Sequence, residues 1–581
     1  MTSPSGRYVI VFNGEVYNFR ELRAELASSA PDVVITGGSD TAVMLAAIDV
    51  WGLEHALTRF IGMFAFALWD REERVLRLVR DRLGVKPLYV ARLRTGGIAF
   101  ASELSAIAAH PGFSRTADRN ALASYLRYNC VPAPSTGFAD AIKLRPGTFL
   151  TLRSPSLADA RETVFWDPAT IVADAQSQPF RGDEEEAATE LERLLRDAVR
   201  LRMIADVPVG AFLSGGIDSS TVVALMTDQS STVRTFTIAS DSKSHDEGEH
   251  AARVAKHLGT QHETLRVSKS DALAAVQRIP EMLDEPFGDS SIIPTFLVSS
   301  MARRHVTVAL SGDGGDELFG GYNRHVWGPS VWRASRALPR LARRPVARTL
   351  ARLPAATIDR LGERLGRFSI RLPGQQMQKV GRLLGAESEE ALYLALRSHW
   401  HAPLSVVLGA EREVPAWPGM NAPALPTHAE RMMFADMVSY LPDDILTKVD
   451  RASMAVSLEA RVPLTDHRVV AFAWSLPAEM KIRHLRGKQI LRRILGRRIP
   501  AEFIDRPKSG FGIPMAAWLR GPLREHLLDR LAPARVHAAG LVDPQAVSAC
   551  IERHLSGRAD EHEALWDMVT LHGWAERFGA T

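Results

Sequence analysis

Cysteine is scarce in this chain of 581 residues, which has only Cys130 and Cys550. Two cysteines exclude a disulfide framework and suit a reducing compartment. No apolar run approaches the ~20 residues that a membrane-spanning helix needs, and we find no signal peptide at the start. Basic and acidic residues nearly balance, at 71 and 67, which argues against a nucleic-acid-binding protein. We therefore expect a cytoplasmic globular protein without nucleic-acid or membrane partners.

The remaining composition is ordinary for such a protein, with 46% hydrophobic and 24% charged residues. The length allows up to about four domains, although two large ones would account for it equally well.

The most informative stretch, residues 207–220, reads Val-Pro-Val-Gly-Ala-Phe-Leu-Ser-Gly-Gly-Ile-Asp-Ser-Ser. Apolar runs on both sides of the glycines predict a buried strand, a tight turn and the start of a helix. Gly215 and Gly216 let the backbone approach a ligand closely, and the helix N-terminus beyond them favours phosphate or pyrophosphate. Asp218 lies where it could bind Mg²⁺. On spacing alone, a plain strand-to-helix turn remains the alternative.

A second glycine-rich stretch follows another apolar strand, residues 306–310. Residues 311–322 read Ser-Gly-Asp-Gly-Gly-Asp-Glu-Leu-Phe-Gly-Gly-Tyr and contain three acids, Asp313, Asp316 and Glu317. An open α/β sheet binds its ligand at the carboxyl ends of its strands. We therefore expect one strand end to hold pyrophosphate and the other to complete a metal site.

These motifs resemble a known family. Residues 214–220 resemble the pyrophosphate loop of ATP-dependent amide-forming enzymes. With residues 311–322 and Leu-Glu-Ala-Arg-Val-Pro at 458–463, they resemble the synthetase half of glutamine-hydrolysing asparagine synthetases. Phe-Asn-Gly-Glu-Val-Tyr-Asn at 12–18 and Gly-Ser-Asp-Thr at 38–41 resemble the glutaminase domain of the same family. The resemblance covers essentially the whole chain.

The resemblance implies two α/β units. The first, residues 1–150, would be a truncated α-β-β-α sandwich of the N-terminal nucleophile hydrolase type, a class II glutamine amidotransferase domain. A linker over 151–185 would lead to residues 186–581, a doubly wound parallel-sheet ATP-pyrophosphatase domain with a helical C-terminal part. Alternating strand and helix patterns between residues 209 and 310 favour the same parallel sheet.

The resemblance also implies a set of site residues. ATP and pyrophosphate would be bound by Leu213, Ser214, Gly215, Gly216, Asp218, Ser219, Ile238, Ser311 and Gly312. Asp218 and Asp316 would hold Mg²⁺. Lys508 would neutralise the phosphates, and Asp313 would be the base that deprotonates the attacking ammonia. In the glutaminase domain, Asn13 and Gly14 would stabilise the oxyanion, while Glu15 and Asp40 would hold the α-amino end of glutamine.

The start of the chain departs from the family pattern. The family's glutaminase needs a cysteine as first residue of the mature chain, with its own α-amino group as the base. Here the chain opens Met-Thr-Ser-Pro-Ser, and its first cysteine is Cys130, which we interpret as a small buried residue. The chain therefore has no nucleophilic cysteine for glutamine hydrolysis. We expect either that Met1 is an internal methionine of a longer protein or that glutaminase activity is lost.

The expected function is asparagine synthesis from aspartate, ATP and ammonia through a β-aspartyl-adenylate, with Mg²⁺ as cofactor. In the complete protein, glutamine would supply the ammonia. Alternatives are a relative that adenylates another carboxylate, such as a β-lactam synthetase, a lasso-peptide cyclase or a natural-product amidotransferase, and a non-catalytic nucleotide-binding homologue. The expected partners are small-molecule substrates and, as one possibility, a second copy of the chain in a homodimer.

Overall fold

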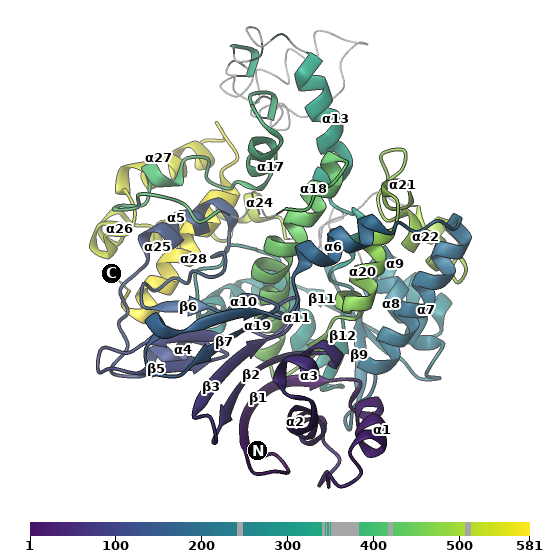
Figure 1. Cartoon of the computed structure of the whole chain (residues 1–581). Helices are drawn as coiled ribbons and strands as arrows, with labels where there is room; N and C mark the ends of the chain where they lie inside the picture. The colour runs from purple at the N-terminus through teal and green to yellow at the C-terminus, as the bar shows by residue number, and fades with distance from the viewer. Residues whose placement is uncertain are drawn as a thin grey trace.

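The computed structural model describes residues 1–240, 248–337, 383–415, 422–505 and 513–580, with isolated positions between 339 and 381. Figure 1 shows two α/β units side by side, with a group of helices from the C-terminal part of the chain beside the first unit. Among these described residues, no helix combines the length and apolar character needed to cross a bilayer.

The first unit contains a five-stranded antiparallel sheet and a smaller three-stranded sheet. The larger sheet has the order β1-β2-β3-β7-β8, and the smaller has the order β5-β4-β6. The strands are β1 (Tyr8–Val16), β2 (Gly62–Asp70), β3 (Val75–Arg80), β4 (Tyr89–Arg92), β5 (Ile98–Ala101), β6 (Ala141–Lys143), β7 (Thr148–Leu152) and β8 (Arg161–Val164).

Apolar packing arranges these sheets in the predicted sandwich. Ala67, Leu78, Val90 and Leu150 belong to a buried cluster between the two sheets. A second cluster joins the larger sheet to α1 (Phe19–Ser29), α2 (Asp40–Trp51) and α3 (Leu53–Arg59). The smaller sheet packs through Tyr89 against a third cluster, which includes residues of α5 (Arg119–Tyr128) and α28 (His562–Phe578). The α-β-β-α layering is therefore confirmed.

The boundary of the first unit differs from the expectation. Residues 151–185 were predicted as a linker, but β8 pairs with β7 as the edge strand of the larger sheet. β8 has only four residues and no apolar alternation, so no strand was predicted there. Next along the chain, α6 (Pro168–Ser177) packs against α20 (His467–Ser475). The first sheet thus extends to Val164.

The second unit is built on a parallel sheet with the order β11-β10-β9-β12-β13. Its strands are β9 (Val209–Phe212), β10 (Arg234–Ser240), β11 (Gln261–Val267), β12 (Val308–Leu310) and β13 (Glu459–Arg461). Because β9 comes first in the chain but lies in the centre beside β12, the sheet is doubly wound and its switch point lies between these two strands. This confirms the predicted fold class.

Helices cover both faces of this sheet. One face packs through Ala211 and Leu310 against α7 (Glu184–Arg202), α8 (Ile217–Thr227) and α9 (Gly248–Leu258). The other face packs through Phe236 and Ala309 against α11 (Ile292–Ala302). Two neighbouring elements, α10 (Lys269–Met282) and α19 (Leu446–Met454), pack against α11.

The C-terminal part is largely helical, as predicted. After the short α12 (Gly315–Phe319) come α13 (Asn323–Ala337), α17 (Glu389–Arg397), α18 (His428–Ala435) and the π-helical segment η5 (Asp436–Ile445). Later helices are α21 (Ala478–Lys481), α22 (Gln489–Gly496), α23 (Ala501–Ile504), α24 (Met515–Arg520), α25 (Arg524–Arg530), α26 (Pro533–Ala539) and α27 (Pro544–Leu555).

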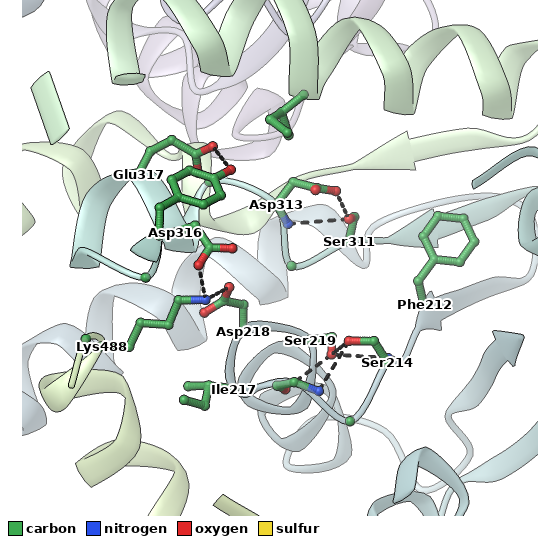
Figure 2. Close-up of a pocket in the computed structure, with 18 of the residues that line it drawn as sticks. Phe212, Ser214, Ile217, Asp218, Ser219, Ser311, Asp313, Asp316, Glu317 and Lys488 are labelled. Atoms are coloured by element: carbon green, nitrogen blue, oxygen red, sulfur yellow. Dashed lines mark hydrogen bonds and ion pairs between the residues drawn. The ribbon is translucent and has the colours of Figure 1, made fainter. Parts of the chain in front are cut away.

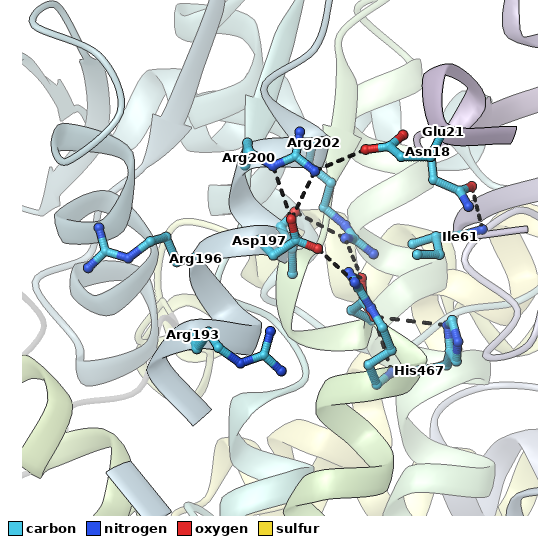
Figure 3. Close-up of polar contacts among 12 residues, drawn as sticks. Asn18, Glu21, Ile61, Arg193, Arg196, Asp197, Arg200, Arg202 and His467 are labelled. Atoms are coloured by element: carbon cyan, nitrogen blue, oxygen red, sulfur yellow. Dashed lines mark hydrogen bonds and ion pairs between the residues drawn. The ribbon is translucent and has the colours of Figure 1, made fainter. Parts of the chain in front are cut away.

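Ion pairs connect the two units at several places. Figure 3 shows one group around the end of α7, where Arg200 bonds Glu21 of α1 at 3.1 Å. Deeper in the interface, Lys143 of β6 lies 3.1 Å from Glu285, and both side chains are less than 10% exposed. Buried charges of this kind are costly unless they are paired, so these pairs fix how the units meet.

Candidate functional site

A cavity of about 630 Å³ opens at the carboxyl ends of β9 and β12, where the sheet order changes direction. A volume in this range is typical of a small-molecule site. Figure 2 shows that both glycine-rich stretches face this space. The sequence therefore predicted correctly that these two stretches meet.

The first stretch forms a tight turn stabilised by its own serines. Gly215 has a φ of +72°, and a Cβ there would lie 2.6 Å from Cδ2 of His250, so a glycine is needed. The hydroxyls of Ser214 and Ser219 lie 3.0 Å apart, and the Gly216 N–H donates to Ser214 Oγ at 3.2 Å. The turn leads directly into α8, whose N-terminus favours an anion.

The second stretch packs directly on the first. A Cβ at Gly312 would lie 2.6 Å from the backbone nitrogen of Ser219, and one at Gly315 would lie 2.5 Å from Cγ of Asp218. The hydroxyl of Ser311 bonds the carboxylate of Asp313. The glycines in this segment therefore allow the acids after β12 to lie beside Asp218 on α8.

Asp218 and Asp316 converge on one ammonium group, that of Lys488. The Nζ atom of Lys488 lies 2.7 Å from Asp316 Oδ1 and also pairs with Asp218 (Figure 2). Burial alone would lower the pKa of Lys488, but the two carboxylates outweigh it and raise the pKa above its ordinary value. Lys488 is thus a fixed cation between the two glycine-rich stretches.

A second lysine also lines the cavity. Lys448 of α19 bonds Asp289 Oδ2 at 3.1 Å. Burial would lower the pKa of Lys448, yet Asp289 and Asp313 raise it. Nearby, burial and Asp316 raise the pKa of Glu317 to about 7, while the Tyr322 hydroxyl donates to Glu317 at 2.7 Å.

Of Leu213 and Ile238, which were predicted to bind ATP, only the first is in the lining. Leu213 lines the cavity, together with Phe212 and Phe236. The lining includes Thr237 but not Ile238, which packs instead in the apolar cluster with α11. Lys508 lies outside the described residues.

The carboxylates in the cavity offer an incomplete metal site. Within the part of the chain that the structure describes, no group of three or more His, Cys, Asp or Glu side chains could hold a metal ion. Asp218 and Asp316 provide two hard oxygen donors, and Mg²⁺ usually binds through one or two carboxylates plus phosphate oxygens and water. The donor set therefore fits Mg²⁺ that arrives with a nucleotide.

The predicted glutamine-binding residues gather on the first unit. Asn13 and Gly14 lie within β1, where a Cβ at Gly14 would meet the carbonyl of Met63 at 2.1 Å. The Asn13 amide donates to Ser102 Oγ at 2.8 Å, and Asp40 accepts from the N–H of Val16 at 2.9 Å.

Glu15 belongs to the first unit, but its side chain contacts the second unit. It lies 3.4 Å from Arg461 Nη2 on β13. Burial raises the pKa of Glu15 to about 7, although Arg461 lowers it in part. The Arg461 carbonyl also accepts the Ser311 N–H at 2.9 Å, so one residue touches both predicted sites.

Lys488, Lys448 and Asp289 were not predicted from the sequence. Both lysines follow the glycine-rich stretches by more than 100 residues, Asp289 lies 22 residues before Ser311, and none of the three carries a motif of its own. Lys488 has a φ of +58° just before α22, and nothing in its local sequence predicts that conformation. Cys130 is buried, as its interpretation as a small buried residue predicted, and burial raises the pKa of its thiol well above the ordinary value.

Comparison with known proteins identifies the family. The asparagine synthase family model matches residues 190–576, and the glutamine amidotransferase domain model matches residues 1–166. A solved glutamine phosphoribosylpyrophosphate amidotransferase from B. subtilis is 16% identical and covers 40% of this chain and 46% of its own, at a TM-score of 0.20. At that TM-score the likeness carries no structural inference.

Curated relatives match almost the full chain. A Mycobacterium tuberculosis protein, named provisionally as a glutamine-hydrolyzing asparagine synthetase, is 37% identical over 98% of this chain and 84% of its own length. Glutamine-hydrolyzing asparagine synthetase 1 of Bacillus subtilis is 31% identical over 98% and 85%. The amidase chry2 of Gibberella zeae is 26% identical over 93% and 82%. From the family model and these relatives, the chain belongs to the family of glutamine-hydrolyzing asparagine synthetases.

Proposed function

We propose that the second unit binds ATP in the cavity between β9 and β12 and converts a carboxylate, the β-carboxylate of aspartate, into an amide. The observation that carries this proposal is the convergence of Asp218, Asp316 and Lys488 beside the pyrophosphate loop. These charges suit a reaction that transfers AMP and releases pyrophosphate.

In the first step, a carboxylate oxygen of aspartate attacks the α-phosphorus of ATP. A bond forms between that oxygen and phosphorus, the bond to the β-phosphate oxygen breaks, and pyrophosphate leaves. The N–H groups after Gly215 at the start of α8, with the hydroxyls of Ser214 and Ser219, hold the pyrophosphate. Lys488 stabilises the negative charge that builds on these oxygens.

A divalent cation would also be held here. Asp218 and Asp316 would bind Mg²⁺, which supplies positive charge to the phosphate oxygens when bound. Lys508, which lies in the sequence Arg-Pro-Lys-Ser-Gly-Phe-Gly, would add a further positive charge.

In the second step, ammonia attacks the carbonyl carbon of the aspartyl-adenylate, and AMP leaves with the electrons of the broken C–O bond. The attacking nitrogen must lose a proton. Asp313 is the proposed base, because it lies at the end of β12 on the wall of the same cavity. Asp313 also lies close enough to Lys448 to contribute to the raised pKa of that lysine.

The glutamine-binding assignments belong to the same proposal. Asn13 and Gly14 would stabilise the oxyanion, and Glu15 and Asp40 would bind the glutamine ammonium. We also propose a homodimer, which size-exclusion chromatography with light scattering would test.

Aspartate-dependent exchange of labelled pyrophosphate into ATP tests the first step by itself. We expect exchange that requires aspartate and Mg²⁺ and disappears in Asp218→Ala, whose fold should be unaffected. Formation of asparagine from added ammonium chloride then tests the second step. Undiminished exchange in Asp218→Ala would refute the metal-site assignment, and exchange with another carboxylate but not aspartate would identify a different substrate.

A further inference from the structure

Lys488 reaches the carboxylates of the proposed metal site from an unusual backbone conformation. Its φ of +58° lies in the left-handed region, which is unfavourable for a residue with a side chain. The Lys488 N–H donates to the Phe319 carbonyl at 2.9 Å, at the end of the short helix α12 that also carries Asp316. Strained residues of this kind persist only where the surrounding structure holds them, and they cluster at functional sites. The backbone thus ties this lysine to the same helix as one of the two acids.

Two glycines leave room for the lysine beside the acid. A Cβ at Gly321 would lie 2.1 Å from Cε of Lys488 and 1.9 Å from Oδ1 of Asp316. A Cβ at Gly487 would lie 2.0 Å from the carbonyl oxygen of Gly320. A larger residue at either position would push the lysine or its backbone away from Asp316. The close approach of the ammonium to this acid is therefore built into the two turns.

The ammonium bonds carboxylate oxygens that a divalent cation would also use. Nζ of Lys488 lies 2.7 Å from Asp316 Oδ1 and pairs with Asp218 Oδ2 (Figure 2). The three side chains are between 9% and 22% exposed, so water screens their charges only in part. A change at one of the three groups therefore affects what the other two bind.

The other charged groups of the cavity have partners of their own. Among the described residues, the remaining ionisable acids and bases of the lining are Asp289, Asp313, Glu317, Lys448, Arg486 and Arg492. Lys448 bonds Asp289 at 3.1 Å, and both arginines pair with Asp505. The two remaining acids accept hydrogen bonds from neutral hydroxyls. Within the described part of the chain, Lys488 is therefore the cation that bonds both acids of the proposed metal site, and it reduces their two negative charges to one.

A divalent cation and this ammonium compete for the same two acids. Mg²⁺ gives up its water reluctantly and usually binds through one or two carboxylates together with phosphate oxygens. While the ammonium bonds both acids, they attract a divalent cation less strongly. Binding of the cation without a nucleotide should therefore be weak.

A nucleotide changes this balance, because its triphosphate brings several negative charges to the loop beside Asp218. The side chain of lysine has a flexible stem of four carbons. The ammonium of Lys488 can therefore turn from the carboxylates to phosphate oxygens while its strained backbone stays in place. Both acids are then available to the cation.

We propose that Lys488 couples the binding of the divalent cation to the binding of the nucleotide. Its ammonium holds Asp218 and Asp316 until a triphosphate draws it onto the phosphate oxygens, and the two acids then bind the cation that comes with the nucleotide. The inference rests on the proposed function, which assigns both sites. It adds that the two acids bind a divalent cation only weakly without a nucleotide. By linkage, nucleotide and cation then raise each other's affinity by the same factor.

Binding of Mn²⁺ to the protein without nucleotide tests the inference, and the electron paramagnetic resonance signal of the free ion measures it. Lys488→Met should bind Mn²⁺ at least about 10-fold more tightly than the native protein, because a positive charge beside both acids is removed. The same variant should bind a non-hydrolysable ATP analogue more weakly in the absence of metal, because the phosphates lose a cation. If the lysine only held the two turns together, its removal would weaken both kinds of binding, and that result would refute the inference.

Lys488→Arg and Lys448→Met are the matched controls. Arginine keeps the positive charge, so Lys488→Arg should keep the affinity for Mn²⁺ low. Lys448 lines the same cavity but bonds Asp289 rather than the acids of the metal site, so Lys448→Met should bind Mn²⁺ about as the native protein does. If Lys488→Met does not fold, Lys488→Gly replaces it, since glycine adopts a φ of +58° without strain.

Adding Asp218→Ala to Lys488→Met separates this inference from the proposed function. Loss of Mn²⁺ binding in the double variant places the ion at the proposed metal site. If the native protein binds Mn²⁺ as tightly as Lys488→Met and loses it on Asp218→Ala, the inference is overturned while the proposed site stands. If the double variant keeps the Mn²⁺ affinity of Lys488→Met, the ion binds elsewhere, and both the inference and the metal-site assignment are wrong.

Discussion

At the scale of single residues, the cavity concentrates charges whose burial is offset by close partners. Lys488 keeps its charge because two carboxylates outweigh the cost of its burial. Glu317 has no such cation among its hydrogen-bond partners, and its pKa is raised to about 7. The same cavity therefore holds one group that stays charged and one that titrates near neutral pH.

Replacing Lys488 with methionine should reduce pyrophosphate exchange by about 100- to 1,000-fold, the usual effect of removing a group that stabilises transition-state charge. The phosphates would also lose a cation, so ATP binding should weaken. Steady-state kinetics would measure both effects. The control is Lys256→Met on the exposed surface of α9, which should leave the kinetics unchanged.

Glu317 should make stability depend on pH. Its folded pKa of about 7 lies above the ordinary value of 4.5, so the folded state binds the extra proton, and stability is lost as the pH rises from 4.5 to 7. Glu317→Gln lacks this loss. Its stability relative to the native protein should therefore increase by up to about 3 kcal/mol between pH 4.5 and 8. Urea unfolding at several pH values would measure it, and parallel curves for the two proteins would contradict the assignment.

At the scale of elements, sequence reasoning predicted four of the five strands of the parallel sheet, β9 to β12, from their apolar patterns, but it did not predict β13 (Glu459–Arg461). It also predicted that the ends of β9 and β12 meet, since carboxyl ends of adjacent parallel strands share one edge. It did not predict Lys488 or Lys448, which reach the cavity through tertiary packing of distant helices. The pattern within a segment carries no information about such packing, and β8 was missed because its residues, Arg-Glu-Thr-Val, have no apolar alternation.

The close contact between the two glycine-rich elements gives a prediction at this scale. In Gly312→Ala, the new Cβ would meet the Ser219 nitrogen at 2.6 Å, so the two turns must separate. We expect destabilisation of about 1–3 kcal/mol and a large loss of pyrophosphate exchange. Gly496→Ala is the matched control, because its Cβ would lie 3.7 Å from Ile504 Cδ1. Thermal unfolding and exchange assays on both variants would decide the point.

At the scale of the whole molecule, the units meet through charges as well as apolar surface. Arg461 contacts Glu15 through its side chain and Ser311 through its carbonyl. Lys86 of the first unit pairs with Asp450 on α19 at 3.0 Å, and α19 also carries Lys448. The two predicted sites are thus built against one shared interface, and the stability of that interface determines their relative position.

Variants of the buried pair of Lys143 and Glu285 test how much that interface contributes to the free energy of unfolding. Glu285 also accepts hydrogen bonds from the Tyr89 hydroxyl at 3.0 Å and the Gly137 N–H at 3.1 Å. In Lys143→Met the carboxylate stays buried without its cation, which should lower the free energy of unfolding by about 3–5 kcal/mol. Adding Glu285→Gln should restore at least half of the loss, because the buried charge is then gone.

The exposed pair of Arg200 and Glu21 is the comparison, since Arg200→Ala should cost less than about 1 kcal/mol. Urea unfolding of the three variants would rank them, and an equal cost for Lys143→Met and Arg200→Ala would show that burial of the pair does not hold the units together.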